Sequence, residues 1–123
     1  MTKILIVDDE IDVCDFVKHF FEERDYKVFT ALNSEEALRL LRREKPDIVL
    51  LDVRMPGMDG VETLKKIRIF DKDATVIMVT AVDDHARMEE VKKFGAAKYI
   101  TKPLVLEELE AAVLSYTKGT GNG

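Results

Sequence analysis

Short apolar runs alternate with amphipathic stretches along the whole chain. Runs rich in β-branched residues predict five strands, at 4–7, 27–30, 48–51, 76–79 and 98–100. The first, third and fourth runs are apolar without alternation, which is typical of strands buried on both faces of a parallel sheet. Between the runs, apolar side chains recur at helical spacing. In the first such stretch they are Val13, Phe16, Val17 and Phe20.

Residues that begin and end helices stand between these runs. Asn33 followed by Glu36 predicts an N-cap with a reciprocal partner, and Asp83 or Asp84 could cap the fourth helix. Gly95 stands where a glycine that ends a helix is expected. Five strand–helix units with short connections therefore predict an α/β fold, in which helices cover both faces of a parallel sheet.

Length and charge narrow the class further. A chain of 123 residues fits one domain, which we expect to span 1–118, with a flexible glycine-rich tail at 119–123. The formal net charge of −5 disfavours direct binding to a nucleic acid. No apolar run approaches the ~20 residues that span a bilayer, so no membrane insertion is expected. The single cysteine, Cys14, excludes an intramolecular disulfide and favours a reducing, cytoplasmic location.

Polar side chains stand at the carboxyl ends of the predicted strands. They are Asp8 and Asp9 after the first strand, Asp52 after the third, Thr80 after the fourth and Lys102 after the fifth. In an open parallel sheet these ends meet at one edge, near the switch in strand order. Each residue alone has an ordinary explanation, such as a helix cap for an aspartate or a solvated side chain for a lysine. The joint pattern predicts a functional site.

The residue types indicate the chemistry of this site. Three neighbouring carboxylates repel one another unless a cation joins them, and hard oxygen ligands with room for water suit Mg²⁺. Lys102 adds a positive charge and Thr80 a hydroxyl, so a phosphoryl group fits the remaining space. Asp52, at the tip of a middle strand, is the candidate nucleophile that would form an aspartyl phosphate.

At these positions the chain resembles the receiver domain of two-component response regulators, over essentially its whole length. The matching segments are 4–10, 46–52, 55–60, Thr80-Ala81 and Lys102-Pro103. Each segment alone is weakly specific, whereas five in this order and at these spacings are highly specific. The resemblance implies a flavodoxin-like fold, a five-stranded parallel sheet in the order 2-1-3-4-5 with five helices on its two faces.

The resemblance also implies a phosphoryl donor and a metal. Asp52 would accept a phosphoryl group from a histidine kinase, a histidine phosphotransfer protein or a small phosphodonor. Asp8 and Asp9 would hold Mg²⁺ (or Mn²⁺), with Asp52 and the backbone carbonyl of Arg54 as further ligands. Such a chain is not an enzyme in the usual sense, because it catalyses only its own phosphorylation and dephosphorylation.

A second group of residues would transmit the change. The resemblance implies that Lys102 contacts the phosphoryl oxygens, that its bond to Pro103 is cis, and that Thr80 with Ala81 moves to bind the phosphoryl group. Tyr99 would turn inward when Thr80 moves. The face made by the fourth helix, fifth strand and fifth helix would then change shape and bind an unidentified downstream protein, or the phosphoryl group would pass onward. Pairing of two phosphorylated copies is a further option.

Two positions near the site lack the residue types that favour rapid hydrolysis of an aspartyl phosphate. Arg54 lies two residues after Asp52, and Val82 lies two residues after Thr80. Neither is an acid or an amide suited to positioning an attacking water. The sequence therefore predicts a long-lived aspartyl phosphate. The alternative is that Arg54 merely balances the charge of the acidic cluster.

The segment after Pro103 is unusually apolar. Leu104 and Val105, together with Ile11 at the start of the first helix, could form a patch where a kinase or phosphotransfer protein docks. The simpler alternative is that the leucines of this segment, Leu104 and Leu106, pack into the core.

Two other functions fit parts of the pattern. A phosphohydrolase with an aspartate nucleophile commonly carries a second acid two residues later, where this chain has Arg54. An adaptor that acts without phosphorylation would be expected to lack part of the site, yet all five polar positions are present. No output domain follows, and the sequence does not distinguish a stand-alone receiver from a fragment of a longer regulator.

Overall fold

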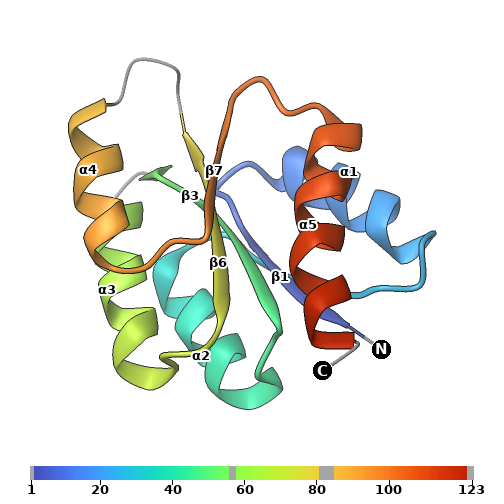
Figure 1. The fold of residues 1–123 in the computed structure, drawn as a ribbon, viewed down its shortest axis with the longest axis horizontal. Coiled ribbons are helices and arrows are strands. Elements are labelled where there is room, and N and C mark those ends of the chain that lie inside the picture. Colours follow the sequence, from blue (N-terminus) through green and yellow to red (C-terminus); the bar gives the residue numbers. More distant parts are fainter. Residues whose placement is uncertain (1, 56–57, 81–84, 122–123) are drawn as a thin grey trace.

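A parallel sheet lies at the centre of the molecule, between two layers of helices (Figure 1). The computed structural model describes residues 2–55, 58–80 and 85–121. The strands are β1 (Lys3–Val7), β2 (Lys27–Ala31), β3 (Ile48–Asp52), β4 (Arg54–Met55), β5 (Met58–Asp59), β6 (Thr75–Thr80) and β7 (Lys98–Thr101). The helices are α1 (Ile11–Glu22), α2 (Ser34–Glu44), α3 (Gly60–Phe70), α4 (His85–Lys93) and α5 (Leu106–Gly121).

The central sheet has the order β2-β1-β3-β6-β7, and neighbouring strands in it are parallel. Counted along the chain, its strands therefore follow the order 2-1-3-4-5, and the predicted fold class is confirmed. Each predicted strand is present and is extended by one or two residues. The antiparallel pair β4–β5 was not predicted, because strands of two residues leave no pattern in the sequence.

Two apolar cores lie on opposite faces of the sheet. Leu5 and Val7 of β1 point to the core beneath α2, α3 and α4, whereas Ile4 and Ile6 point to the core beneath α1 and α5. The same division of the helices is visible in Figure 1, with α1 and α5 on one side. Because both faces of the sheet are covered, its inner strands must be apolar at every position, as their sequence indicated.

The predicted helix ends are partly confirmed. The Asn33 side chain accepts a hydrogen bond from the amide of Glu36 at 2.9 Å, but the Glu36 carboxylate accepts from the amide of Leu32, one residue before the cap. Gly95 has a φ of +75°, the conformation expected of a glycine that ends a helix. The candidate caps at 83 and 84 lie outside the described residues.

Helix α5 continues past the predicted domain boundary. Its backbone is helical from Leu106 to Gly121, so the boundary expected at 118 does not coincide with the end of this helix. One turn of backbone hydrogen bonds can extend a helix through small residues even where glycine lowers its propensity. The flexibility of 119–123 stays a prediction.

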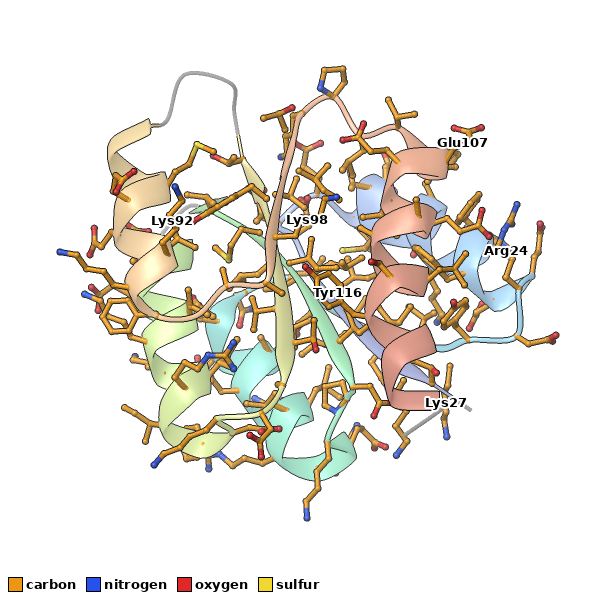
Figure 2. The ribbon with its side chains drawn as sticks, viewed as in Figure 1. Arg24, Lys27, Lys92, Lys98, Glu107 and Tyr116 are labelled. Atoms are coloured by element: carbon orange, nitrogen blue, oxygen red, sulfur yellow. The ribbon has the colours of Figure 1, made fainter. Side chains whose placement is uncertain are left out.

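Side chains also tie the helices to one another across the molecule. Arg24, after α1, forms an ion pair with Glu110 of α5 at 2.8 Å, and the Tyr116 hydroxyl of α5 donates to the carbonyl of Ala97 at 2.7 Å. Arg24 and Tyr116 are labelled in Figure 2. The same figure labels Lys27 and Lys98, exposed residues that begin β2 and β7, the two edge strands of the central sheet.

Arg68 of α3 joins three segments through its guanidinium group. Its nitrogens donate to the carbonyls of Phe94 and Gly95, at the end of α4, and to that of Ala74 before β6, at 2.7 to 2.9 Å. Longer contacts reach the carbonyls of Asp71 and Lys72. The five donors of a guanidinium are arranged in a rigid fork, which allows one side chain to satisfy several carbonyls.

Substitution Arg68→Met should therefore destabilise the fold by about 2–3 kcal/mol, because several partly buried carbonyls lose a charged donor. The free energy of unfolding from urea titration measures the effect. Arg68→Lys should recover part of the loss, and Lys66→Met, at an exposed position of the same helix, should change stability by less than about 0.5 kcal/mol. An Arg68→Met protein as stable as the wild type would contradict this role.

Candidate functional site

Three carboxylates converge at the carboxyl edge of the central sheet. In the register of β1 and β3, Val7 lies opposite Leu51, so the next residues, Asp8 and Asp52, leave the sheet side by side. With Asp9 they offer carboxylate oxygens that all lie within 4.8 Å of one another. The structure thus brings together the three aspartates that the strand ends predicted.

Tight packing behind Asp52 fixes its backbone. Gly60, the first residue of α3, donates its amide hydrogen to the carbonyl of Val53 at 2.7 Å. A Cβ at this glycine would collide with the carbonyls of Asp52 and Val53, so only glycine allows α3 to begin so close to the end of β3. The close approach of the helix to the strand therefore positions the Asp52 carboxylate.

Burial and mutual repulsion make this cluster electrostatically costly. Asp8 and Asp52 are each 4% exposed, whereas Asp9 is exposed. Burial raises the pKa of Asp8 above its usual range, and the charge of Asp52 adds to the increase, although a hydrogen bond from the amide of Glu10 opposes it. Hard oxygen ligands in this arrangement fit a divalent cation, which would offset the repulsion.

Lys102 supplies a positive charge inside the cluster. Its Nζ lies 3.0 Å from Asp52 Oδ2 and 4.0 Å from Asp8 Oδ2. Partial burial acts to lower the pKa of Lys102, but the hydrogen bond and charge of Asp52 outweigh it and raise the pKa. The backbone amide of Lys102 donates to the carbonyl of Thr80 at 2.8 Å, and the bond to Pro103 is cis, as the resemblance implied.

Thr80 and Tyr99 lie on neighbouring strands near this edge. Thr80 ends β6 with its side chain buried, one residue beyond Val79, which is paired with Asp52. Tyr99 of β7 is half-buried, and its hydroxyl donates to the carbonyl of Met88 in α4 at 2.7 Å. Burial raises the pKa of the Tyr99 hydroxyl, so it is a neutral donor at physiological pH. Tyr99 thus connects the strand beside the site to α4.

The lifetime positions are only partly described. Arg54 lies in β4, two residues after Asp52, but its side chain is outside the part of the chain that the structure describes. Ala81 and Val82 also lie outside it. Their predicted roles stay predictions.

An apolar surface borders the acidic cluster. Ile11 is 59% exposed and Val105 48% exposed, whereas Leu104 is half-buried and packs against the α1–α5 core. Ile11 and Val105 are thus available for the expected docking patch, whereas Leu104 packs into the core, as the alternative interpretation predicted. A hollow of about 290 Å³ lies beside it, lined by Glu10, Val13, Phe16, Lys102, Pro103 and Leu104.

Phe16 lies outside the buried face of α1. Helical spacing groups it with Val13, Val17 and Phe20, yet its side chain is 61% exposed. The buried positions of α1 are Cys14, Val17 and Phe21, so the apolar stripe is centred on a different line of the helix. The helix contains three phenylalanines, Phe16, Phe20 and Phe21, and one face of a short helix cannot bury all three. This number was the sequence feature that indicated an exposed phenylalanine.

Cys14 is buried next to the carboxylate cluster of Asp8, Asp9 and Asp52, and its thiol has low reactivity. Its Sγ donates to the carbonyl of Asp8 at 3.4 Å. Burial, reinforced by the charge of Asp8, raises the pKa of the thiol to about 11. The reactive thiolate is therefore scarce at neutral pH.

Comparison with known proteins places these features in a family. Residues 4–114 match the family model described as response regulator receiver domain. Sporulation initiation phosphotransferase F of Bacillus subtilis is 39% identical over 114 residues, which are 93% of this chain and 92% of that protein. The alkaline phosphatase synthesis transcriptional regulatory protein PhoP of the same organism is 38% identical over 111 residues, and the match covers 90% of this chain and 46% of PhoP.

Solved structures agree with the sequence comparisons. The chemotaxis protein CheY4 of Vibrio cholerae superposes with a TM-score of 0.89 at 31% identity, over 94% of this chain and 98% of that one. The response regulator TrrA of Thermotoga maritima, in complex with Mg²⁺-BeF, has a TM-score of 0.83 at 36% identity, over 94% of this chain and 99% of that one. Among the described residues, no helix is both long and apolar enough to cross a membrane.

Replacement of one buried carboxylate tests the electrostatic account. Because the pKa of Asp8 is raised in the folded state, its ionised form opposes folding, so Asp8→Asn should increase the free energy of unfolding at pH 7 in a chelating buffer. The gain should shrink as the pH falls toward the usual aspartate range, where the wild-type carboxyl also becomes neutral. Urea unfolding at several pH values measures both effects. Asp15→Asn, at an exposed position, is the control, and a destabilised Asp8→Asn protein would refute the account.

Proposed function

Because the chain belongs to the family of response regulator receiver domains, we propose that it is a phosphorylation-controlled switch of a two-component or phosphorelay system. The observation that carries the proposal is the position of Asp52. Its buried carboxylate stands among two further aspartates and 3.0 Å from the Lys102 ammonium. This arrangement suits a carboxylate that attacks phosphorus while nearby positive charge stabilises the phosphoryl oxygens.

In the proposed reaction, an oxygen of Asp52 forms a bond to the phosphorus of the donor. The bond from phosphorus to the leaving group breaks at the same time, and the leaving group, an imidazole nitrogen or the oxygen of a small phosphodonor, departs with the bonding electrons. Lys102 moves its hydrogen bond from the Asp52 carboxylate to a phosphoryl oxygen. Mg²⁺, held by Asp8, Asp9, Asp52 and the Arg54 carbonyl, would neutralise charge on the transferring group. A solved relative that carries Mg²⁺-BeF supports this assignment.

The switch acts through the two residues beside the site. The hydroxyl of Thr80 donates a hydrogen bond to the new phosphoryl group. Tyr99 turns inward and loses the hydrogen bond that its hydroxyl donates to the Met88 carbonyl. The surface of α4, β7 and α5 then takes a different shape, which is a shift between two populations rather than a new fold.

The apolar surface beside the cluster is the proposed contact for the phosphoryl donor. Ile11, Phe16 and Val105 are exposed around the acceptor, so a histidine kinase or histidine phosphotransfer protein can dock there and present its phosphohistidine. The relative named a phosphotransferase matches over nearly its whole length, which supports onward transfer as one output. The other output is binding of a downstream protein, or of a second copy of the chain, to the altered face of α4, β7 and α5. The proposal places the chain in the cytoplasm with these partners.

Phosphorylation can be tested by intact mass after incubation with acetyl phosphate. The wild type should gain one phosphoryl group with Mg²⁺ and none with chelator, because the carboxylate cluster needs the cation to accept more negative charge. Asp52→Asn should gain none, and Asp73→Asn, an exposed aspartate far from the site, should behave as wild type. A wild-type protein that gains no phosphoryl group under any condition would favour the adaptor that acts without phosphorylation.

The lifetime of the aspartyl phosphate tests the roles of Arg54 and Val82. We expect slow loss of the phosphoryl group from the wild type, and loss about tenfold faster from Arg54→Asn or Val82→Asn, since an amide can position the attacking water. Decay of the phosphorylated mass with time gives the rates. Arg54→Met removes the charge without adding an amide, so equal acceleration by this variant would support simple charge balance. Fast wild-type decay that Arg54→Asn leaves unchanged would contradict the hypothesis.

A further inference from the structure

A second surface of unusual character lies on α2 and the end of α3. Arg39, Arg42 and Arg43 follow one another at helical spacing along the outer side of α2, opposite its buried residues Ser34, Ala37 and Leu41. Phe70, the last residue of α3, is 50% exposed beside them. We call Arg39, Arg42, Arg43 and Phe70 the arginine face.

Arg42 is the centre of this surface. Its guanidinium carbon lies 4.3 Å from the centroid of the Phe70 ring, which is a cation–π contact. A guanidinium has five N–H donors, so this contact is compatible with hydrogen bonds to a carboxylate. Two hollows meet at Arg42. One, of about 400 Å³, lies along α2 between Glu35 and Arg43. The other, of about 390 Å³, is bordered by Leu41, Lys45, Phe70 and Asp71.

The charge of the arginine face contrasts with that of the whole chain. The chain carries a formal net charge of −5, yet three arginines and Lys45 gather around the two hollows, against two acidic lining residues, Glu35 and Asp71. Arg43 is paired with Glu44 at 2.9 Å. Within 2–55, 58–80 and 85–121, neither Arg39 nor Arg42 forms an ion pair. Two guanidinium groups beside these hollows, the second of which is lined in part by the Phe70 ring, are therefore available to an anionic partner.

We propose that the arginine face binds an acidic polypeptide segment that carries a large apolar side chain. Carboxylates of the segment pair with Arg39 and Arg42, and its apolar side chain packs against the exposed ring of Phe70 in the second hollow. A nucleic acid fits less well. Arg42 already covers one face of the Phe70 ring, Glu35 lines the first hollow, and the chain as a whole repels phosphates.

This surface is separate from the phosphoacceptor. Helices α2 and α3 run back from the carboxyl edge of the sheet, so Leu41, Lys45 and Phe70 lie near its opposite edge, as Figure 1 shows for the ends of both helices. A partner bound there leaves Asp52 accessible. The inference goes beyond the proposed function, because it assigns a binding surface that does not depend on phosphorylation.

Fluorescence anisotropy with a labelled peptide tests the inference on the unphosphorylated full chain. The probe is a short peptide of aspartates and glutamates with one central leucine, compared with the same peptide carrying serine in place of leucine. The leucine peptide should bind more tightly than the serine peptide, and both should weaken as salt rises. The double substitution Arg39→Gln with Arg42→Gln should weaken binding by about tenfold.

Matched variants distinguish the surface from general charge. Lys18→Gln with Lys93→Gln removes the same two charges from α1 and α4 and should leave the affinity within about twofold of wild type. Phe70→Ser should reduce the affinity of the leucine peptide to that of the serine peptide. No binding of either peptide, equal loss in the two double variants, or tighter binding of a single-stranded RNA of the same charge would each overturn the inference.

Discussion

The close approach of buried carboxylates is the constraint on which the rest of the structure depends. Asp8 and Asp52 follow paired positions of adjacent strands, so the sheet holds them together whatever their charges. The ammonium of Lys102, which β7 brings to the same edge, offsets only part of the repulsion. The remaining repulsion favours any species that adds positive charge to the cluster, such as a divalent cation.

Helix α4 is held at two places by side chains of different elements. The Tyr99 hydroxyl binds the carbonyl of Met88 in its middle, and the Arg68 guanidinium binds the carbonyls of Phe94 and Gly95 just beyond its end. Inward rotation of Tyr99 would release the first place and leave the second intact. Such a motion would tilt α4 about its carboxyl end, because Arg68 keeps that end against α3 and β6.

Much of this molecule follows from local sequence patterns. The apolar runs predicted the strands of the central sheet, and the polar residues at their ends predicted the cluster of Asp8, Asp9 and Asp52. Features that depend on packing were missed. Phe16 is exposed because α1 rotates to bury Cys14, Val17 and Phe21, and helical spacing alone does not fix that rotation. The network of Arg68 joins carbonyls distant in sequence, so no short motif predicts it.

The lysines at the sheet's two borders have a consequence for the behaviour of the protein at high concentration. β2 and β7 each have one strand neighbour, so their outer backbone groups could recruit a strand from another molecule. Lys27 and Lys98 begin these strands, and stacking two copies edge to edge would bring ammonium groups into a dehydrated seam. Charges at these positions oppose the edge-to-edge strand pairing that leads to fibrous aggregates. They therefore disfavour pairing of two copies through the edges of the sheet.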